Sequence, residues 1–201
     1  MSNVRPLRMQ SSAATLSRLF TFIGCNVGPW RVARVDCVAG EPLPAAERLS
    51  VIVGTVPELQ HEASWALRGI TSNERYVVRE EKAALVSKQE GLGRPASTLA
   101  ALIPIRKSAA WWALAQDERR EVFEAQSLHV ATGLKYLPGV ARRLHHCRDL
   151  GAEEPFDFLT WFEYAPSVAK AFDELVRTLR ASPEWEYVDR EVDIRLSQEV
   201  V

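Results

Sequence analysis

Hydrophobic and polar positions follow their most regular pattern in the second half of the chain. Leu99–Ile105 is a continuous apolar run, which is typical of a buried strand. An apolar stripe at helical spacing predicts a helix that begins at Pro166. The stripe consists of Val168, Phe172, Leu175, Val176 and Leu179. The remaining pattern predicts a helix over 117–133 and strands over 137–148, 155–164 and 185–196.

The first half has a weaker pattern. Leu19–Ile23 and Trp30–Val38 flank a turn cluster, which predicts two strands paired as a hairpin. Residues 40–54 contain two prolines and predict an irregular segment with a short apolar piece. Ser64–Ile70 predicts another strand, and residues 74–89 predict a helix.

The order of these elements predicts an α+β fold. Residues 98–201 run strand, helix, strand, strand, helix, strand, which is the ferredoxin-like βαββαβ motif. We interpret residues 17–97 as a second, reduced copy of that motif and residues 1–16 as a flexible tail. Two such halves packed sheet to sheet predict an α+β barrel, with helices outside and the inner sheet faces lining a cavity.

Composition narrows the class of protein. The chain has 201 residues, 47% of them apolar and 25% charged, with a net charge of −1, so no global field attracts nucleic acid or anionic lipid. Three cysteines without CxxC spacing argue against a disulfide framework and a cysteine-based zinc site, and favour reduced thiols in a cytoplasm. No secretory signal or membrane-spanning stretch is indicated.

Two residues interrupt apolar faces of the predicted elements. His129 shares a helix face with Val122 and Ala125, and Arg142 occupies an apolar position on the next strand. A neutral imidazole and a buried guanidinium across one pocket indicate a metal cofactor and an anionic substrate. Because no HxH or HxxxH pair includes His129, a single axial histidine of a haem fits better than a multi-histidine site. The alternatives are a hydrogen-bonded core histidine, and an arginine that reaches solvent or pairs with Glu163.

Further candidates lie near these two residues in the predicted fold. Arg106 and Lys107 follow the buried strand and are suited to holding carboxylates, while Trp111 is suited to packing on a macrocycle. Glu184 is within reach of the histidine as a carboxylate partner. The alternatives are a solvated Lys107, core or interface tryptophans, and a surface acid at 184. The acids of the last strand predict a solvated face, and they are Glu186, Asp189, Glu191 and Asp193.

These residues together resemble one known family. The segments are Ser72 to Tyr76, Leu102-Ile103-Pro104-Ile105-Arg106-Lys107-Ser108, Trp111-Trp112, His129, Tyr136-Leu137-Pro138, Arg142, and Thr160 to Tyr164. The combination is similar to the short, N-terminally reduced lineage of the chlorite dismutase family. The resemblance is strong from about residue 64 to the C-terminus and weak before that.

The resemblance implies a dimeric barrel that binds one haem b per chain and converts chlorite to chloride and dioxygen. It implies His129 as the proximal iron ligand with Glu184 as its hydrogen-bond partner. It further implies Arg142 as the distal arginine with Gln89 nearby. Lys107, Trp111 and Tyr76 are then expected along the haem and its propionates.

Four other interpretations stay open. A coproheme decarboxylase has the same fold, typically without a distal arginine and with a reactive tyrosine, for which Tyr76 is the candidate. A dye-decolourising peroxidase is disfavoured because no GxxDG motif is present. The others are a non-catalytic haem carrier or sensor, and a haem-free barrel. The physiological role stays open, with chlorite detoxification as one hypothesis.

Overall fold

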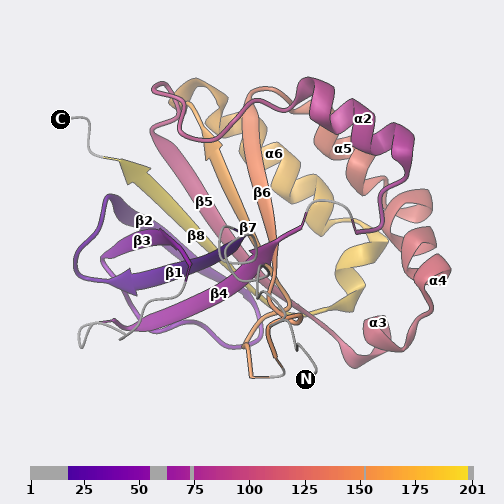
Figure 1. Ribbon diagram of the computed structural model, residues 1–201, viewed down its shortest axis with the longest axis horizontal. Helices are drawn as coiled ribbons and strands as arrows, with labels where there is room; N and C mark the ends of the chain where they lie inside the picture. The colour runs from indigo at the N-terminus through magenta and orange to yellow at the C-terminus, as the bar shows by residue number, and fades with distance from the viewer. Residues whose placement is uncertain (1–17, 55–62, 73–74, 152, 199–201) are drawn as a thin grey trace, which may run out of the picture.

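Eight strands form a closed antiparallel barrel in the computed structural model, which describes residues 18–54, 63–72, 75–151 and 153–198 (Figure 1). The predicted tail and Asn73-Glu74 lie outside the described residues. The strands are β1 (Leu19–Cys25), β2 (Trp30–Ala39), β3 (Arg48–Val53), β4 (Trp65–Thr71), β5 (Leu99–Lys107), β6 (Val140–His146), β7 (Phe158–Tyr164) and β8 (Val188–Gln198).

The two halves of the barrel share one strand order. The neighbours are β4-β1-β3-β2 in the first half and β8-β5-β7-β6 in the second, so each half places its strands in the order fourth, first, third, second. All pairs are antiparallel, and the halves meet where β2 pairs with β8 and β4 with β6. The second half of the barrel therefore repeats the strand order of the first half.

The helices in the described part of the chain lie over the second half of the barrel (Figure 1). The sequence pattern behind Pro166 is confirmed, because Pro166–Val168 forms a 3₁₀ turn and α6 buries the predicted apolar stripe. Among the described residues, no helix has the length and apolar character to cross a membrane. The helices are α2 (Arg79–Lys88), α3 (Ala109–Ala113), α4 (Gln116–Arg120), α5 (His129–Lys135) and α6 (Ala169–Arg180).

Side-chain alternation divides the core into two layers. On β5, Ala100 and Leu102 point into the barrel, whereas Ala101 and Ile103 point toward the helices. The barrel interior is packed with aromatic and aliphatic side chains that include Phe22, Leu49, Leu159 and Leu196. The expectation that the inner sheet faces line a cavity is confirmed by a cavity inside the barrel, but the pocket that contains His129 and Arg142 lies between the outer sheet face and the helices.

The helix predicted over 117–133 is wrong as a single element. After α4, Glu121–Gln126 forms a π-helical segment, and Leu128 adopts the left-handed region with a φ of 50° before α5 begins at His129. A π-helical segment accommodates more residues per turn than an α-helix. Apolar spacing did not reveal the break, because both pieces turn a similar face inward.

Three further strand predictions need correction. Trp30–Val38 does form a strand, but β2 pairs with β3 and β8 and not with β1 as a hairpin. Residues 40–54, predicted as irregular, contain β3. The last strand begins at Val188, because Pro183–Tyr187 forms a 3₁₀ helix.

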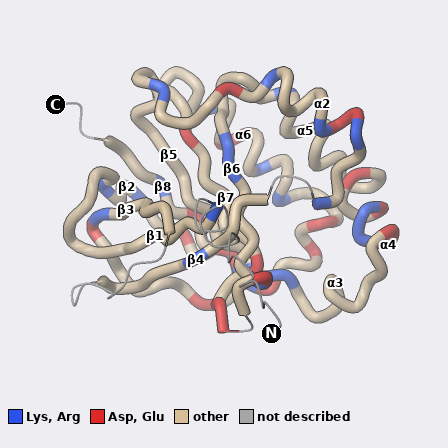
Figure 2. Tube along the Cα trace, viewed as in Figure 1, with Lys and Arg blue, Asp and Glu red and all other residues tan. Residues whose placement is uncertain are grey.

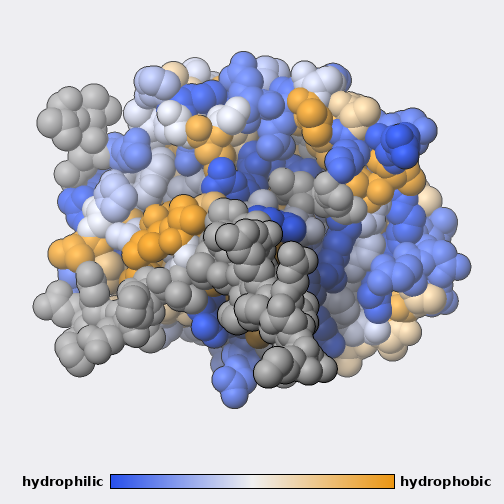
Figure 3. Space-filling view, in the orientation of Figure 1, coloured by the Kyte–Doolittle hydropathy of each residue, from blue (hydrophilic) through white to orange (hydrophobic). Residues whose placement is uncertain are grey.

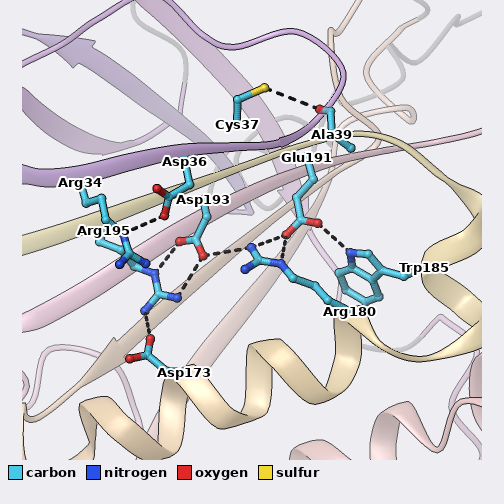
Figure 4. A network of polar contacts seen from close by, with 10 residues as sticks. All are labelled: Arg34, Asp36, Cys37, Ala39, Asp173, Arg180, Trp185, Glu191, Asp193 and Arg195. Atoms are coloured by element: carbon cyan, nitrogen blue, oxygen red, sulfur yellow. Dashed lines mark hydrogen bonds and ion pairs between the residues drawn. The ribbon is translucent and has the colours of Figure 1, made fainter.

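The acids of β8 do not form a solvated face. Glu191 and Asp193 are completely buried beneath α6, whereas Glu186 and Asp189 are exposed. Arg180 from α6 bonds both buried carboxylates, at 2.6 Å and 2.9 Å, and Arg195 bonds Asp193 as well (Figure 4). Burial of these charges is possible because each carboxylate has a cationic partner.

Charge on the surface is mixed in sign. Both signs occur along α2 and α4 in Figure 2, in agreement with the net charge of −1. Hydrophilic residues predominate over the helices in Figure 3, and a separate apolar patch lies on the side of the first strands. Exposed aliphatic side chains in this first half include Val35, Val38 and Val53.

Candidate cofactor pocket

A pocket between the helices and the outer face of β5, β7 and β6 brings together most of the predicted site residues. Its apolar walls include Ile103, Ile105, Leu144, Phe158, Phe162 and Val130. A concave site with apolar walls and few polar groups is typical of a cofactor or substrate pocket. Six predicted site residues line it, namely Tyr76, Lys107, Trp111, His129, Arg142 and Glu184.

His129 occupies the first position of α5 on the helix wall. The ring stacks on Phe123, with 4.3 Å between ring centroids. Its Nδ1 atom lies 2.6 Å from Oε2 of Glu184, and since a carboxylate accepts, Nδ1–H is the donor. This bond fixes the tautomer and leaves Nε2 as a free ligand atom, which is how histidine typically binds a metal.

Glu184 and Lys107 form a buried ion pair behind the histidine. Glu184 is 5% exposed, and its Oε1 accepts a hydrogen bond of 2.8 Å from Nζ of Lys107. Burial by itself raises the pKa of Glu184, but the charges and hydrogen bonds of His129 and Lys107 lower it to about 2. The alternatives of a surface acid at 184 and a solvated Lys107 are therefore wrong.

The backbone around Glu184 is held by a second contact. Its N–H donates to Oγ of Ser127, at 2.9 Å, in the segment between the π-helical turn and α5. Nζ of Lys107 also donates to the backbone carbonyl of Glu184, at 3.2 Å. The carboxylate is thereby fixed from both sides toward the imidazole, as a rigid site requires.

Arg142 reaches the pocket from the sheet wall, on β6. Burial lowers the pKa of its guanidinium, because the surroundings disfavour charge. Its backbone carbonyl accepts a 3.0 Å bond from Nε2 of Gln89, which places Gln89 beside this strand but outside the pocket lining. Among the described residues, no acidic side chain forms an ion pair with Arg142, so its charge remains available to an anion.

Glu163 is not the partner of Arg142. Its Oε1 accepts from Nε1 of Trp161 at 2.8 Å, and its Oε2 accepts from the backbone N–H of Gly93. Glu163 lines a separate cavity inside the barrel, together with Arg143 and Trp161. The alternative of an Arg142–Glu163 pair is therefore wrong.

Polar atoms without partners lie at the end of the pocket near α3. Oη of Tyr76 and Nε1 of Trp111 are both buried and without a hydrogen-bond partner in the described structure. The two rings contact each other edge to face, with centroids 5.8 Å apart. Buried donors are normally satisfied, so these two fit the carboxylates of a bound group.

The Tyr76 segment is held in place by an ion pair. Arg120 from α4 pairs with Glu81 on α2 and donates to the backbone carbonyl of Tyr76. Burial raises the pKa of Glu81, but the hydrogen bonds from Arg120 and the backbone of Val78, together with the Arg120 charge, outweigh it and lower the pKa overall. This pair anchors the tyrosine, whose φ of 62° lies in the left-handed region.

The structure does not bring every predicted residue to the site. Arg106 is exposed and does not line the pocket. Sequence reasoning missed Phe123, because the break before His129 hides their stacking. It also missed Trp185, a pocket residue that the expected strand assigned no role. His146 lines the pocket too, and its spacing from Arg142 by four residues on one strand was a usable signal.

Comparison with known proteins gives consistent results. The family model described as chlorite dismutase matches residues 51–200. A curated chlorite dismutase from Ideonella dechloratans is 31% identical over 124 residues, which is 61% of this chain and 41% of that protein. The chain thus aligns with less than half the length of this relative.

Two solved structures of chlorite dismutases also resemble this chain. A structure of dimeric chlorite dismutases from Nitrobacter winogradskyi is 56% identical, covers 90% of this chain and 99% of its own, and has a TM-score of 0.82. A chlorite dismutase from Candidatus Nitrospira defluvii in complex with imidazole is 29% identical over 68% of this chain and 56% of its own, with a TM-score of 0.54. The family model spans about three quarters of the sequence, so the chain belongs to the chlorite dismutase family.

Proposed function

We propose that this protein is a haem b-dependent chlorite dismutase that converts chlorite to chloride and dioxygen. The observation that carries the proposal is the placement of His129 and Arg142 in one pocket. An imidazole with a free Nε2 comes from the helix wall, and an unpaired guanidinium comes from the sheet wall. Membership of the chlorite dismutase family supports the same activity.

The residues of the pocket fit a haem. His129 would hold the iron through Nε2, with Glu184 on its Nδ1–H. The unpartnered Tyr76 hydroxyl and Trp111 indole N–H are suited to the propionates, and the aliphatic and phenylalanine walls are suited to the macrocycle. When bound, haem supplies the redox chemistry by which an oxygen atom leaves chlorite.

Arg142 would bind the anion and keep the reacting fragments together. Its fixed positive charge lies in an apolar pocket, where attraction to an anion is stronger than in water. The chlorine-oxygen fragment left after oxygen transfer would stay beside the guanidinium. Arg142 would thus keep the fragment at the site until chloride and dioxygen are formed, because confinement makes a second step effectively intramolecular.

We further propose the assembly that the resemblance implies. The shared strand order of the two halves supports two ferredoxin-like units, 17–97 and 98–201, of which the first contributes the described helix α2 and the second contributes α3 to α6. The relative from Nitrobacter winogradskyi is described as dimeric, which supports a homodimer. Sedimentation of the purified protein tests the dimer. The expected cytoplasmic location stays a prediction.

Oxygen evolution tests the function. Haem is added to the purified protein, the Soret band is recorded, and chlorite is injected in an oxygen electrode. We expect one dioxygen per chlorite consumed, and in His129→Ala we expect the loss of both the native spectrum and the gas. A wild-type Soret band without oxygen would instead favour a haem carrier, a sensor or a coproheme decarboxylase. An unchanged spectrum and rate in His129→Ala would refute the assignment of the ligand.

A further inference from the structure

Trp185 joins two charge clusters on the helix side of the sheet. Its Nε1–H donates to Oε2 of Glu191 at 2.7 Å. Arg180 holds the other oxygen of that carboxylate through two nitrogens, at 2.8 Å and 2.6 Å (Figure 4). Glu191 has no exposed surface, so this arrangement fixes the indole in one orientation.

The Trp185 ring lies against the ammonium of Lys107. Nζ of Lys107 is 5.4 Å from the Trp185 ring centroid and 4.7 Å from that of Trp111. Lys107 is 5% exposed, so its charge has little contact with water. A cation over an aromatic face is attracted by the ring quadrupole, most strongly where both are desolvated.

We propose that Trp185 is a positioning residue for the proximal side of the haem site. Its ring keeps the Lys107 ammonium against Glu184, and this contact sets how strongly Glu184 pulls on the His129 Nδ1–H. The inference rests on the proposed function, because it takes His129 as the iron ligand. Glu191 takes part indirectly, by holding the indole N–H.

The direction of the effect follows from charge. While the Lys107 ammonium neutralises part of the negative charge of Glu184, the carboxylate attracts the Nδ1 proton of His129 less strongly. If the ammonium is displaced, more negative charge reaches His129, which stabilises ferric over ferrous iron. Weakening the Trp185 contact should therefore lower the midpoint potential and strengthen the bond from iron to histidine.

Two substitutions at this position separate the ring face from the indole N–H. The haem-loaded Trp185→Leu and Trp185→Phe proteins are compared with wild type by redox titration and by the iron–histidine stretch in resonance Raman spectra of the ferrous form. We expect Trp185→Leu to shift the potential down and the stretch to higher frequency. Trp185→Phe keeps an aromatic face and should shift both less.

A double-mutant cycle shows whether the effect passes through Lys107. In a Lys107→Met background, Trp185→Leu should cause no further shift of potential or stretch. Trp30→Phe, which alters a buried tryptophan inside the barrel, is the matched control and should shift neither quantity. If Trp185→Leu does not load haem, Glu191→Gln decides, since it weakens the indole bond and should shift both quantities in the same direction.

The outcomes distinguish the two proposals. If the wild-type protein shows no iron–histidine stretch, both the ligand assignment and this inference fail. If the stretch is present but Trp185→Leu leaves it unchanged, only this inference fails. A shift that persists in the Lys107→Met background, or one as large in Trp185→Phe as in Trp185→Leu, would also overturn it.

Discussion

The two faces of the sheet formed by β5, β7 and β6 carry different kinds of side chain. The face inside the barrel is dominated by close-packed apolar residues, among which Leu102 and Leu159 have no exposed surface. The helix-facing side carries Arg142, Lys107 and His146 around a pocket. Because neighbouring strand residues point to opposite faces, one strand contributes to both stability and chemistry.

The difference shows what the helices contribute. The first half of the barrel has the same strand order, but its described helix, α2, packs against α5 and contributes Leu85 to the pocket over the second half. The sheet therefore supplies one wall, and the helices supply the histidine and its carboxylate. Adjacent substitutions on one strand should consequently separate folding from function.

The largest effect on stability is expected at Leu102. Leu102→Ala removes a fully buried side chain from the barrel interior, and it should lower the free energy of unfolding by about 2–5 kcal/mol. Urea denaturation of the apoprotein measures this change. Haem affinity should stay close to wild type, since Leu102 does not line the pocket. A large loss of haem affinity with unchanged stability would contradict the division of the two faces.

The largest effect on turnover is expected at Arg142, which neighbours Arg143 on β6 but lies on the opposite face of the sheet. Arg142→Ala should retain haem but lose about 100- to 1000-fold in the initial rate of oxygen evolution, as removal of a preorganised charge typically does. It should also bleach sooner, because the chlorine-oxygen fragment is no longer held. Arg143→Ala, which alters the interior face, is the matched control. Equal losses in both variants would contradict the role of Arg142.

The third expected effect is a change of folding stability with pH, and it involves one histidine on each face of the sheet. Burial lowers the pKa of His145, inside the barrel, and of His146, at the pocket, from 6.5 to about 4. As pH decreases, both histidines become protonated in the unfolded chain before they do so in the folded protein. Stability should therefore fall between pH 6.5 and 4, by about 3 kcal/mol for each histidine. Urea titrations across this range measure the slope.

His145→Phe tests that contribution on one face. The new ring keeps the edge contacts to Phe20 and Phe22 but loses the titrating nitrogen and the Nδ1–H bond to the Leu159 carbonyl. Stability at neutral pH should fall, while its dependence on pH should weaken by about one proton. An unchanged slope would show that His145 does not titrate in this range.

The smallest effect is expected at the exposed Arg34–Asp36 pair of β2. Their side chains are 58% and 47% exposed, with 2.7 Å between Nε and Oδ2. Arg34→Ala should change the free energy of unfolding by less than about 1 kcal/mol, because solvent screens exposed pairs. Measurement of urea midpoints at low and high salt checks this. A loss of unfolding free energy comparable with that of Leu102→Ala would contradict the view that this exposed pair adds little to stability.

Local periodicity predicted the second half of the fold better than the first. The α6 stripe and the β5 run identified buried faces correctly, because burial there follows directly from spacing. The pairing of β2 with β8 was not predictable, since the paired residues lie more than 150 positions apart in sequence. The location of the pocket was missed because alternation defines two sheet faces without showing which one the helices cover.

Charged residues were the main source of error within the site. Glu191 and Asp193 have the spacing of a solvated strand face, and only the approach of Arg180 from α6 makes their burial possible. Burial of Glu184 likewise depends on Lys107, 77 residues away in sequence. His129 and Arg142 were identifiable because each interrupts an apolar pattern on its own element.

The π-helical segment Glu121–Gln126 leads into the residue that we propose as the iron ligand. Ser127 and His129 follow it closely and both bond Glu184, so deleting one residue within 121–126 would shorten this connection and displace the imidazole from the carboxylate. The chain would still be able to form its barrel, yet the imidazole would face another side. The length of this short stretch, as much as the identity of residue 129, thus decides whether the proposed iron ligand points into the cavity.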